Sequence, residues 1–336
     1  MTDPSEAAPE KTRSGFGEGA GHGTSIDRDT TWCRAHDRAR AGSGTRATRG
    51  RLHGSGAGEQ RPDRDDLVPG ELAVRYGPAG RQVADVYPAV TGVGPRPVVI
   101  WVHGGGWAVG TRATIPRGIV ELASQGISVV SIDHGMAPGA VHPTQVLDVV
   151  QAVNWVASTA AERNFDADNI FLIGHSSGGH LAMLAGFAGG DPVLDPGRPV
   201  IRGVVALAGM SHLEGMLGLD VTRDLAVRQY MGCPVLPVDP CDVSAANPDA
   251  YVDAGDPPLL LVHGTLDLMV PVEQSRSMAA IAQAAGMSVN YFETTDDHDT
   301  IFYNVNTDLI RTWIEVHLLP TEPPTTDPPT TDPPAP

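Results

Sequence analysis

The stretch Asn169-Ile-Phe-Leu-Ile-Gly-His-Ser-Ser-Gly-Gly-His180 decides the fold class of this chain. A short apolar run leads into Gly-His-Ser-Ser-Gly at 174–178, and a helix-forming run follows that ends at Phe187. A strand, a tight turn and a helix around the serine of G-x-S-x-G form the nucleophile-elbow pattern. Glycine is expected at 174 and 178, because strand and helix come so close there that side chains would collide. Ser176 is therefore a candidate nucleophile, and a Gly/Ser-rich connector is the alternative for this motif taken alone.

Patterns typical of strands and helices alternate on both sides of this motif. Two segments joined by Gly77-Pro-Ala-Gly80 predict a hairpin, and the apolar run 98–102 predicts a strand buried on both faces of a sheet. Strands are expected at 71–76, 81–87, 98–102, 127–132, 170–173, 201–207, 258–262 and 288–292, and helices at 115–124, 143–163, 180–187, 222–230, 272–285 and 307–318. This order predicts an α/β fold with a mostly parallel sheet of about eight strands and helices on both faces.

The folded domain is predicted to span residues 67–319, between two tails of different composition. Residues 1–66 are rich in Gly, Ser, Thr, Arg and Asp and almost free of Val, Ile, Leu and Phe. Such a segment cannot bury enough apolar surface to offset the entropy of ordering. Residues 320–336 form a Pro/Thr tract with a repeated T-T-D-P-P, which favours an extended, unpacked chain. We predict that both tails are disordered.

The net charge of −17 belongs to the part of the chain after residue 66. Residues 1–66 hold 11 basic and 11 acidic residues, which leaves 12 basic and 29 acidic residues for the rest. An acidic body argues against nucleic acid as a partner. No run of about 18 apolar residues occurs, so no membrane span is expected. The pattern does not determine the oligomeric state.

The cysteines and the N-terminus give opposite indications about location. Cys233 and Cys241 lie eight residues apart in one irregular segment, and this spacing is compatible with a disulfide or with two free thiols. A disulfide, like the Pro/Thr tract, favours export. The first residues lack the basic and apolar regions of a signal peptide, which favours the cytoplasm by default. Location therefore stays open.

A second glycine motif, His103-Gly-Gly-Gly-Trp107, directly follows the buried strand 98–102. Glycines at this point let backbone N–H groups turn toward one position, as a tetrahedral oxyanion requires. HGGG-type loops accompany the elbow in α/β-hydrolases. The loop follows the third predicted strand and the elbow follows the fifth, so the two motifs support one another.

A serine nucleophile needs a base, and the base needs an orienting carboxylate. In α/β-hydrolases these partners follow in the order Ser, Asp or Glu, His. Asp267 lies just after the strand 258–262, at the edge where open α/β sheets place their sites. His298 is the only histidine between the last predicted strand and the closing helix. These two residues are the candidate acid and base.

Other ionisable residues lie close to these candidates in sequence. Neighbours on one loop rarely face the Nδ1 edge of an imidazole, so we expect the acids beside His298 to be solvated charges. These acids are Asp296, Asp297 and Asp299. His263 and His317 are expected to be structural.

Taken together, the motifs resemble an α/β-hydrolase of the esterase/lipase branch, which includes hormone-sensitive-lipase-like and feruloyl-esterase-like carboxylesterases. The matching stretches are HGGGW at 103–107, GHSSGG at 174–179, HGTLDLMVP at 263–271 and His298. The resemblance implies that Ser176 is the nucleophile, Asp267 the acid and His298 the base. It implies an oxyanion hole made by the backbone N–H groups of Gly105, Gly106 and Ser177. From the same motifs we expect His103, Trp107 and His175 to bind the substrate.

The implied function is a serine carboxylesterase that hydrolyses short acyl or aryl esters through an acyl-enzyme, with no metal or organic cofactor. The partner is then a small-molecule ester. Two departures matter. The segment Asp133-His-Gly-Met-Ala-Pro138 lacks the Tyr and Arg that the family often shows after its fourth strand. His298-Asp299 stands in place of the usual His-Gly, and the preceding Asp296-Asp297-His298 is closer to arylformamidases, so amide hydrolysis is an alternative.

The resemblance also bears on the cap and on the cysteines. Residues 1–66 do not look like the long helical cap of lipase-like members, so we expect an open site with a minimal lid from residues 209–256. The Cys233–Cys241 segment resembles a loop that secreted members tie with a disulfide. A non-catalytic binding protein on the same fold is a third alternative, although such proteins usually lose a triad member and none is lost here.

Overall fold

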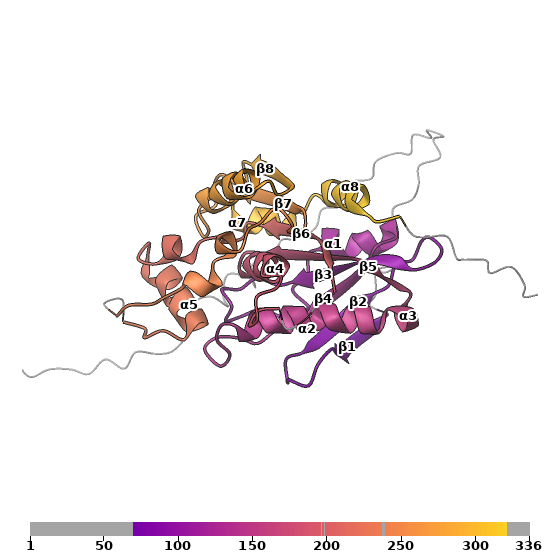
Figure 1. Ribbon diagram of the computed structural model, residues 1–336, viewed down its shortest axis with the longest axis horizontal. Coiled ribbons are helices and arrows are strands. Elements are labelled where there is room, and N and C mark those ends of the chain that lie inside the picture. Colours follow the sequence, from indigo (N-terminus) through magenta and orange to yellow (C-terminus); the bar gives the residue numbers. More distant parts are fainter. Residues whose placement is uncertain (1–69, 196, 198, 237–238, 321–336) are drawn as a thin grey trace, which may run out of the picture. The chain divides into compact units, whose positions relative to one another are not determined.

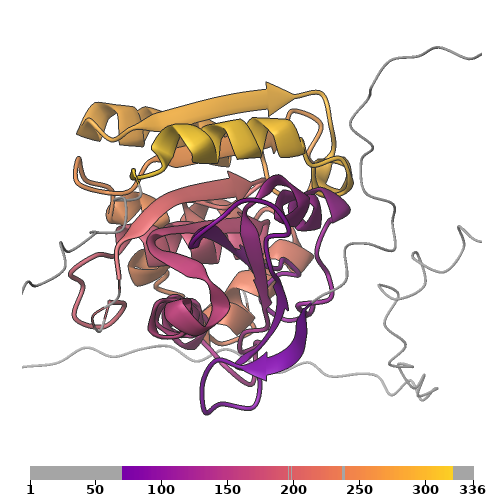
Figure 2. The ribbon, with the colours of Figure 1, turned by 90° about the vertical axis from the view of Figure 1, so that its right-hand side faces the viewer.

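The computed structural model describes residues 70–195, 197, 199–236 and 239–320 (Figure 1). Its centre is an eight-stranded sheet of order β1-β2-β4-β3-β5-β6-β7-β8. The strands are β1 (Glu71–Arg75), β2 (Val83–Tyr87), β3 (Arg96–Val102), β4 (Ser128–Ile132), β5 (Phe165–His175), β6 (Ile201–Leu207), β7 (Leu259–Gly264) and β8 (Val289–Thr294). β2 is antiparallel to both of its neighbours, and the other neighbouring pairs are parallel. The predicted hairpin and mostly parallel sheet are confirmed, and Figure 2 shows the sheet from indigo β1 at one edge to orange β8 at the other.

Helices connect the strands, and most of them begin and end near the predicted positions. They are α1 (Arg117–Val120), α2 (Thr144–Ser158), α3 (Ala160–Arg163), α4 (Ser177–Phe187), α5 (Val221–Met231), α6 (Glu273–Ala285), α7 (His298–Tyr303) and α8 (Thr307–His317), with 3-10 turns η1 (Glu121–Gln125), η2 (Leu213–Met216), η3 (Ser244–Ala246) and η4 (Pro248–Ala250). The helix predicted at 115–124 is α1 followed by η1. The helix predicted at 143–163 is interrupted at Thr159 and forms α2 and α3. The sequence analysis missed α7.

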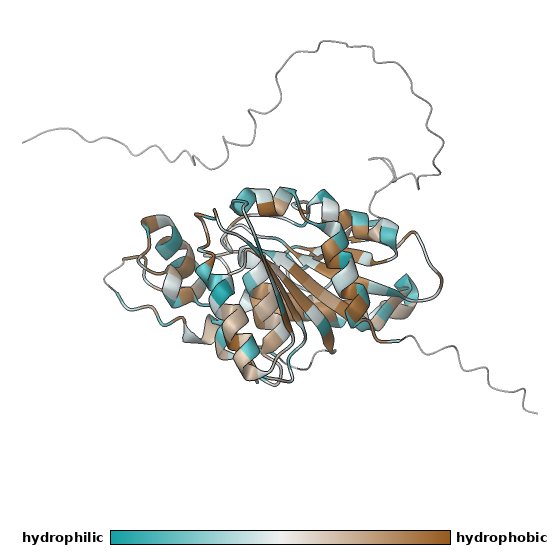
Figure 3. Cartoon of the chain, turned by 90° about the horizontal axis from the view of Figure 1, so that it is seen from above, coloured by the Kyte–Doolittle hydropathy of each residue, from teal (hydrophilic) through white to brown (hydrophobic). Residues whose placement is uncertain are grey.

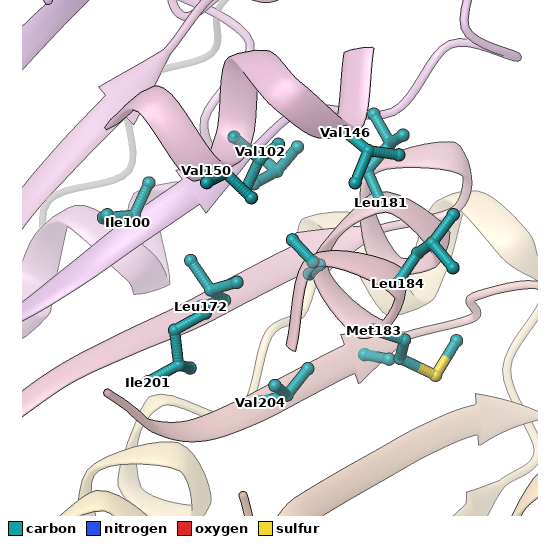
Figure 4. Close-up of a cluster of buried hydrophobic side chains, with 14 of the residues drawn as sticks. Ile100, Val102, Val146, Val150, Leu172, Leu181, Met183, Leu184, Ile201 and Val204 are labelled. Atoms are coloured by element: carbon teal, nitrogen blue, oxygen red, sulfur yellow. The ribbon is translucent and has the colours of Figure 1, made fainter. Parts of the chain in front are cut away.

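Two apolar layers hold the helices on opposite faces of the sheet. Alternate residues of β3 serve different layers, since Ile100 packs with α2 and α4 while Trp101 packs with η1 and α8. Figure 3 shows apolar strands at the centre and polar helix surfaces outside. Figure 4 shows part of the first layer, with labelled side chains of Ile100, Val102, Val146, Val150, Leu172, Leu181, Met183, Leu184, Ile201 and Val204. Burying such an aliphatic side chain stabilises the fold by about 1.5–3 kcal/mol, so this double core fixes the strand ends that carry the site.

The segment 209–256 contains α5 and three short turns, and Figure 1 shows it beyond one end of the sheet. α5 begins at the cap Asp220, whose carboxylate accepts from the N–H groups of Thr222 and Arg223, and it ends at Gly232. Cys233 and Cys241 are joined by a disulfide with an S–S distance of 2.05 Å. This resolves the alternative that the sequence left open for the two thiols.

The predicted tails 1–66 and 320–336 lie outside the described residues, apart from Pro320. Across the described part of the chain, no helix combines the length and the apolar character that a membrane crossing requires.

Candidate active site

Ser176 lies at the point where β5 ends and α4 begins. Its backbone has φ 54° and ψ −123°, a left-handed conformation that a residue with a side chain rarely adopts. Its N–H donates to the carbonyl oxygen of Leu207 at 2.9 Å, which ties the turn to the end of β6. The side chain is partly exposed. A strained serine held at the carboxyl edge of a parallel sheet has the backbone geometry of a nucleophile elbow.

The two glycines of the elbow are required by close backbone contacts. A Cβ on Gly174 would lie 2.2 Å from the carbonyl oxygen of Gly178. A Cβ on Gly178 would lie 2.1 Å from the carbonyl oxygen of Val102, at the end of β3. The predicted collision between strand and helix is confirmed at Gly174, whereas Gly178 is needed for the approach of α4 to β3.

The glycine loop after β3 lies directly against this turn. A Cβ on Gly104 would lie 3.2 Å from Cβ of Ser176, and the N–H of Trp107 donates to Oγ of Ser177 at 3.2 Å. Gly105 and Gly106 have φ values of 120° and 57°, which L side chains disfavour. Among the described residues, no acceptor is found for the N–H groups of Gly105, Gly106 or Ser177. These three donors are thus available to a ligand, and their role as an oxyanion hole stays a prediction.

Asp267 and His298 form a hydrogen-bonded pair, although 31 residues separate them. His298 Nδ1 donates to Oδ2 of Asp267 at 2.6 Å. The other carboxylate oxygen accepts from the N–H groups of Met269 and Val270, both at 2.8 Å. The Asp267 side chain is fully buried, and Nε2 of His263 lies 3.3 Å from its Oδ2. Burial by itself would raise the pKa of Asp267, but hydrogen bonds from His263 and His298 outweigh it and hold the pKa below its usual value. The carboxylate is therefore charged at neutral pH.

His298 is the first residue of α7, a helix that the sequence analysis missed. Asp297 caps this helix, since its Oδ1 accepts from the N–H of Thr300 at 2.8 Å. Asp297 and Asp299 are exposed, as expected for solvated charges. The helix turns the His298 ring toward Asp267, so the acid distant in sequence is its partner. The Asp-His signature at 297–298 could have indicated a capped helix start.

His103 was expected to bind the substrate; its side chain is buried in the structure, and that role stays a prediction. The ring is fully buried and stacks on His134 with centroids 4.3 Å apart. Its Nδ1 donates to the carbonyl oxygen of Gly104 at 2.9 Å. Burial, with the neighbouring His134, lowers the pKa of His103 to about 3. His134 stands where the family often has Tyr, and it is also fully buried. His103 therefore supports the glycine loop directly, and His134 packs behind it.

Trp107 was also expected to bind the substrate; its side chain is only 2% exposed, and that role stays a prediction. Its ring stacks on Tyr230 of α5 with centroids 4.5 Å apart. Its Nε1 donates to Nδ1 of His180 at 3.3 Å, and Nε2 of His180 donates to the carbonyl oxygen of Ala246 at 2.7 Å. The sequence analysis did not single out His180, although a lone histidine in an apolar helix was a signal for a buried link. This chain of contacts joins the glycine loop, α4 and the segment 209–256.

His175 is the third residue expected to bind the substrate, and it too is buried, at 7% exposure. Its Nε2 donates to the carbonyl oxygen of His298 at 3.1 Å. The side chain points toward α7, and its role in substrate binding stays a prediction. His263, expected to be structural, is fully buried between Oγ of Ser275 at 2.7 Å and the carbonyl oxygen of Val270 at 2.9 Å.

Helix α5 approaches the site from the segment predicted to act as a lid. A Cβ on Gly106 would lie 3.8 Å from Cβ of Ala226. The guanidinium of Arg223 donates to the carbonyl oxygen of Leu268, in the loop that carries Asp267. Leu268 is 82% exposed. The segment therefore contacts both the glycine loop and the acid loop.

Comparison with known proteins places this site in a family. Residues 84–281 match the BD-FAE family, and the match includes both glycine motifs and Asp267. The chain belongs to the BD-FAE family. Esterase LipQ of Mycobacterium tuberculosis is 31% identical over 67% of this chain and 56% of its own length. Esterase LipC of the same organism is 32% identical over 59% of this chain and 51% of its own length.

Two further similar proteins are also named as esterases. The probable isoprenylcysteine alpha-carbonyl methylesterase ICMEL1 of Arabidopsis thaliana is 28% identical over 64% of this chain and 47% of its own length. The chain spans about half the length of the curated relatives it matches. A truncated carbohydrate esterase from gut microbiota superimposes with a TM-score of 0.68 at 23% identity, covering 77% of this chain and 99% of that one. The shared architecture confirms the predicted α/β-hydrolase fold.

Proposed function

We propose that this BD-FAE-family protein is a serine carboxylesterase that hydrolyses short acyl or aryl esters. The observation that carries the proposal is the 2.6 Å hydrogen bond between His298 and the buried Asp267, together with the strained backbone of Ser176, whose neighbour His175 contacts His298. A charged carboxylate at Nδ1 keeps the proton on that nitrogen and leaves Nε2 as the basic atom. The names of LipQ and LipC, both esterases, support the same chemistry.

In this proposal, Oγ of Ser176 attacks the ester carbonyl carbon while its proton passes to Nε2 of His298. The carbonyl oxygen becomes an oxyanion that accepts hydrogen bonds from Gly105, Gly106 and Ser177. The tetrahedral intermediate collapses, and the leaving alcohol takes the proton from His298. Water then attacks the acyl-enzyme and gives one proton to His298. The second tetrahedral intermediate collapses as Oγ of Ser176 leaves and takes that proton from His298, which releases the acid and restores the serine and the neutral base. Asp267 stabilises the imidazolium that forms in both halves of the reaction.

The test is a Ser176→Ala variant assayed with 4-nitrophenyl esters of increasing acyl length. We expect kcat to fall by about 10⁴-fold or more, because the attacking atom is lost. Ser277→Ala, at an exposed position of α6, is the matched control and should keep native rates. Turnover by the Ser176 variant at the native rate would contradict the proposal.

Amide hydrolysis by the same residues is the alternative. The Asp297-His298 pair that suggested it is explained by helix capping, so it gives no separate support to an arylformamidase. Comparing kcat/KM for a formyl anilide and for a 4-nitrophenyl ester decides between the two reactions. A non-catalytic binding protein would leave a fluorophosphonate probe unreacted.

A further inference from the structure

One contact connects the elbow that carries the proposed nucleophile with the proposed base, and it takes no part in the proposed proton transfers. His175 immediately precedes Ser176, and its Nε2 donates to the carbonyl oxygen of His298. The two rings have centroids 4.6 Å apart, and Phe302 of α7 lies 5.2 Å from the His175 ring. The His175 ring therefore packs against α7, and among the described residues the hydrogen bond found for this ring goes to the backbone of the base.

This contact ties α7, which carries the base, directly to the elbow that carries the serine. Asp267 orients the His298 ring, but it belongs to the loop after β7 and not to the elbow. α7 has six residues, and Ile301 is its buried anchor. The two ends of the His175–His298 bond are 123 residues apart in sequence. This bond thus joins the carbonyl of the base to the residue covalently attached to the nucleophile.

His175 also touches the glycine loop. A Cβ on Gly104 would lie 3.3 Å from Nδ1 of His175 and 2.8 Å from its carbonyl oxygen. Burial, followed by the nearby His298, lowers the pKa of His175 to about 3, so the ring is neutral at pH 7. Because a carbonyl oxygen can only accept, the single ring proton lies on Nε2. The ring is thus a fixed donor between the loop, the elbow and the base.

We propose that His175 is a positioning residue that sets the separation between Ser176 and His298 through its hydrogen bond to the His298 carbonyl. This inference rests on the proposed function, since it requires those two residues to be nucleophile and base. Misplacing reacting groups by about 1 Å costs about 100-fold in rate. If His175 has this role, a variant that lacks its hydrogen bond should lose up to about 100-fold in kcat while KM stays nearly unchanged.

Three variants of one position separate the hydrogen bond from the packing. His175→Phe keeps a ring but removes the donor. His175→Gln places its amide nitrogen near the position of Nε2, and His175→Asn places it near Nδ1. With 4-nitrophenyl acetate we expect the Phe and Asn variants to lose about 10- to 100-fold in kcat with KM nearly unchanged. The Gln variant should recover to within about fivefold of the native rate.

Rates are to be expressed per reactive site, counted by titration with a fluorophosphonate, so that a misfolded fraction does not imitate a slower reaction. If the Phe variant fails to fold, the Gln and Asn variants, which differ by one methylene, decide the question. Equal rates for these two, or a native kcat in the Phe variant, would overturn the inference and leave the proposed function intact. A native protein that neither reacts with the probe nor hydrolyses the ester would overturn both.

Discussion

At the scale of single residues, the pairing of His298 with Asp267 is the feature most open to a direct test. Replacing Asp267 with Asn removes the charge and favours the wrong histidine tautomer. In the proposed mechanism, kcat with a 4-nitrophenyl ester should then fall by about 10³- to 10⁴-fold. Steady-state kinetics at constant pH measure this loss.

Asp299 provides the matched control for that variant. It is the next residue after His298 and is exposed, so Asp299→Asn should leave kcat within about twofold of the native value. The reverse result, with Asp299→Asn slow and Asp267→Asn near native, would show that the neighbouring acid orients the base. The carboxylate that the fold brings in from a different loop would then be structural.

Residue types and their order along the chain were enough to predict Ser176, Asp267 and His298 as candidates. The sequence did not predict in the same way whether the side chains of neighbouring motif residues face the substrate or the protein core. His103, Trp107 and His175 belong to motifs at the site, yet all three side chains point into the protein. Whether a motif residue faces substrate or core depends on contacts such as the stacking of Trp107 on Tyr230, which comes from a segment more than 100 residues away.

At the scale of elements, the junction of β5, α4 and β3 depends on glycine at position 178. A methyl group there would meet the carbonyl oxygens of Val102 and His103 at 2.1 and 2.6 Å. Both acceptors are backbone atoms at the end of a buried strand and cannot move aside like a side chain. We expect Gly178→Ala to lower the free energy of unfolding by about 1–3 kcal/mol, measured by urea denaturation.

Gly139→Ala is the control, because an added Cβ would meet only the carbonyl oxygen of Met136, at an ordinary 3.5 Å. If the two variants lose the same stability, the close approach of α4 to β3 is not what requires glycine. The Gly178 variant should also react more slowly with a fluorophosphonate, since a displaced α4 moves Ser177 relative to Ser176.

The inner strands β3 to β7 were predictable because each carries an apolar run that matches burial on both faces of the sheet. α7 was not, since its six residues hold only one buried apolar side chain, Ile301, and its start resembles an acidic loop. The break between α2 and α3 at Thr159 was likewise not predicted, because the helical spacing of apolar residues continues through Ala160. Elements that tertiary contacts stabilise more than their own pattern does are the ones that sequence analysis misses.

At the scale of the whole molecule, several buried histidines make folding sensitive to acid. Burial lowers the pKa of His103, His175 and His180 to about 3, below the ordinary 6.5 of an unfolded chain. Between these values the unfolded chain binds protons that the folded protein cannot, so stability is fully present above pH 6.5 and falls as the pH decreases. For three such groups the loss between pH 7 and pH 5 is on the order of 5 kcal/mol.

This loss is a large share of the 5–15 kcal/mol that stabilises a typical domain, so urea denaturation should show a steep fall in the free energy of unfolding between pH 7 and pH 5.

The variant His180→Gln tests whether buried histidines cause this pH dependence of the free energy of unfolding. Its amide can still donate to the carbonyl oxygen of Ala246, but it takes up no proton. The variant should therefore be less stable than the native protein at pH 7 and lose less on acidification. If the free energy of unfolding of the native protein did not change between pH 7 and pH 5, protonation of these histidines would not destabilise the fold. The prediction would then be wrong.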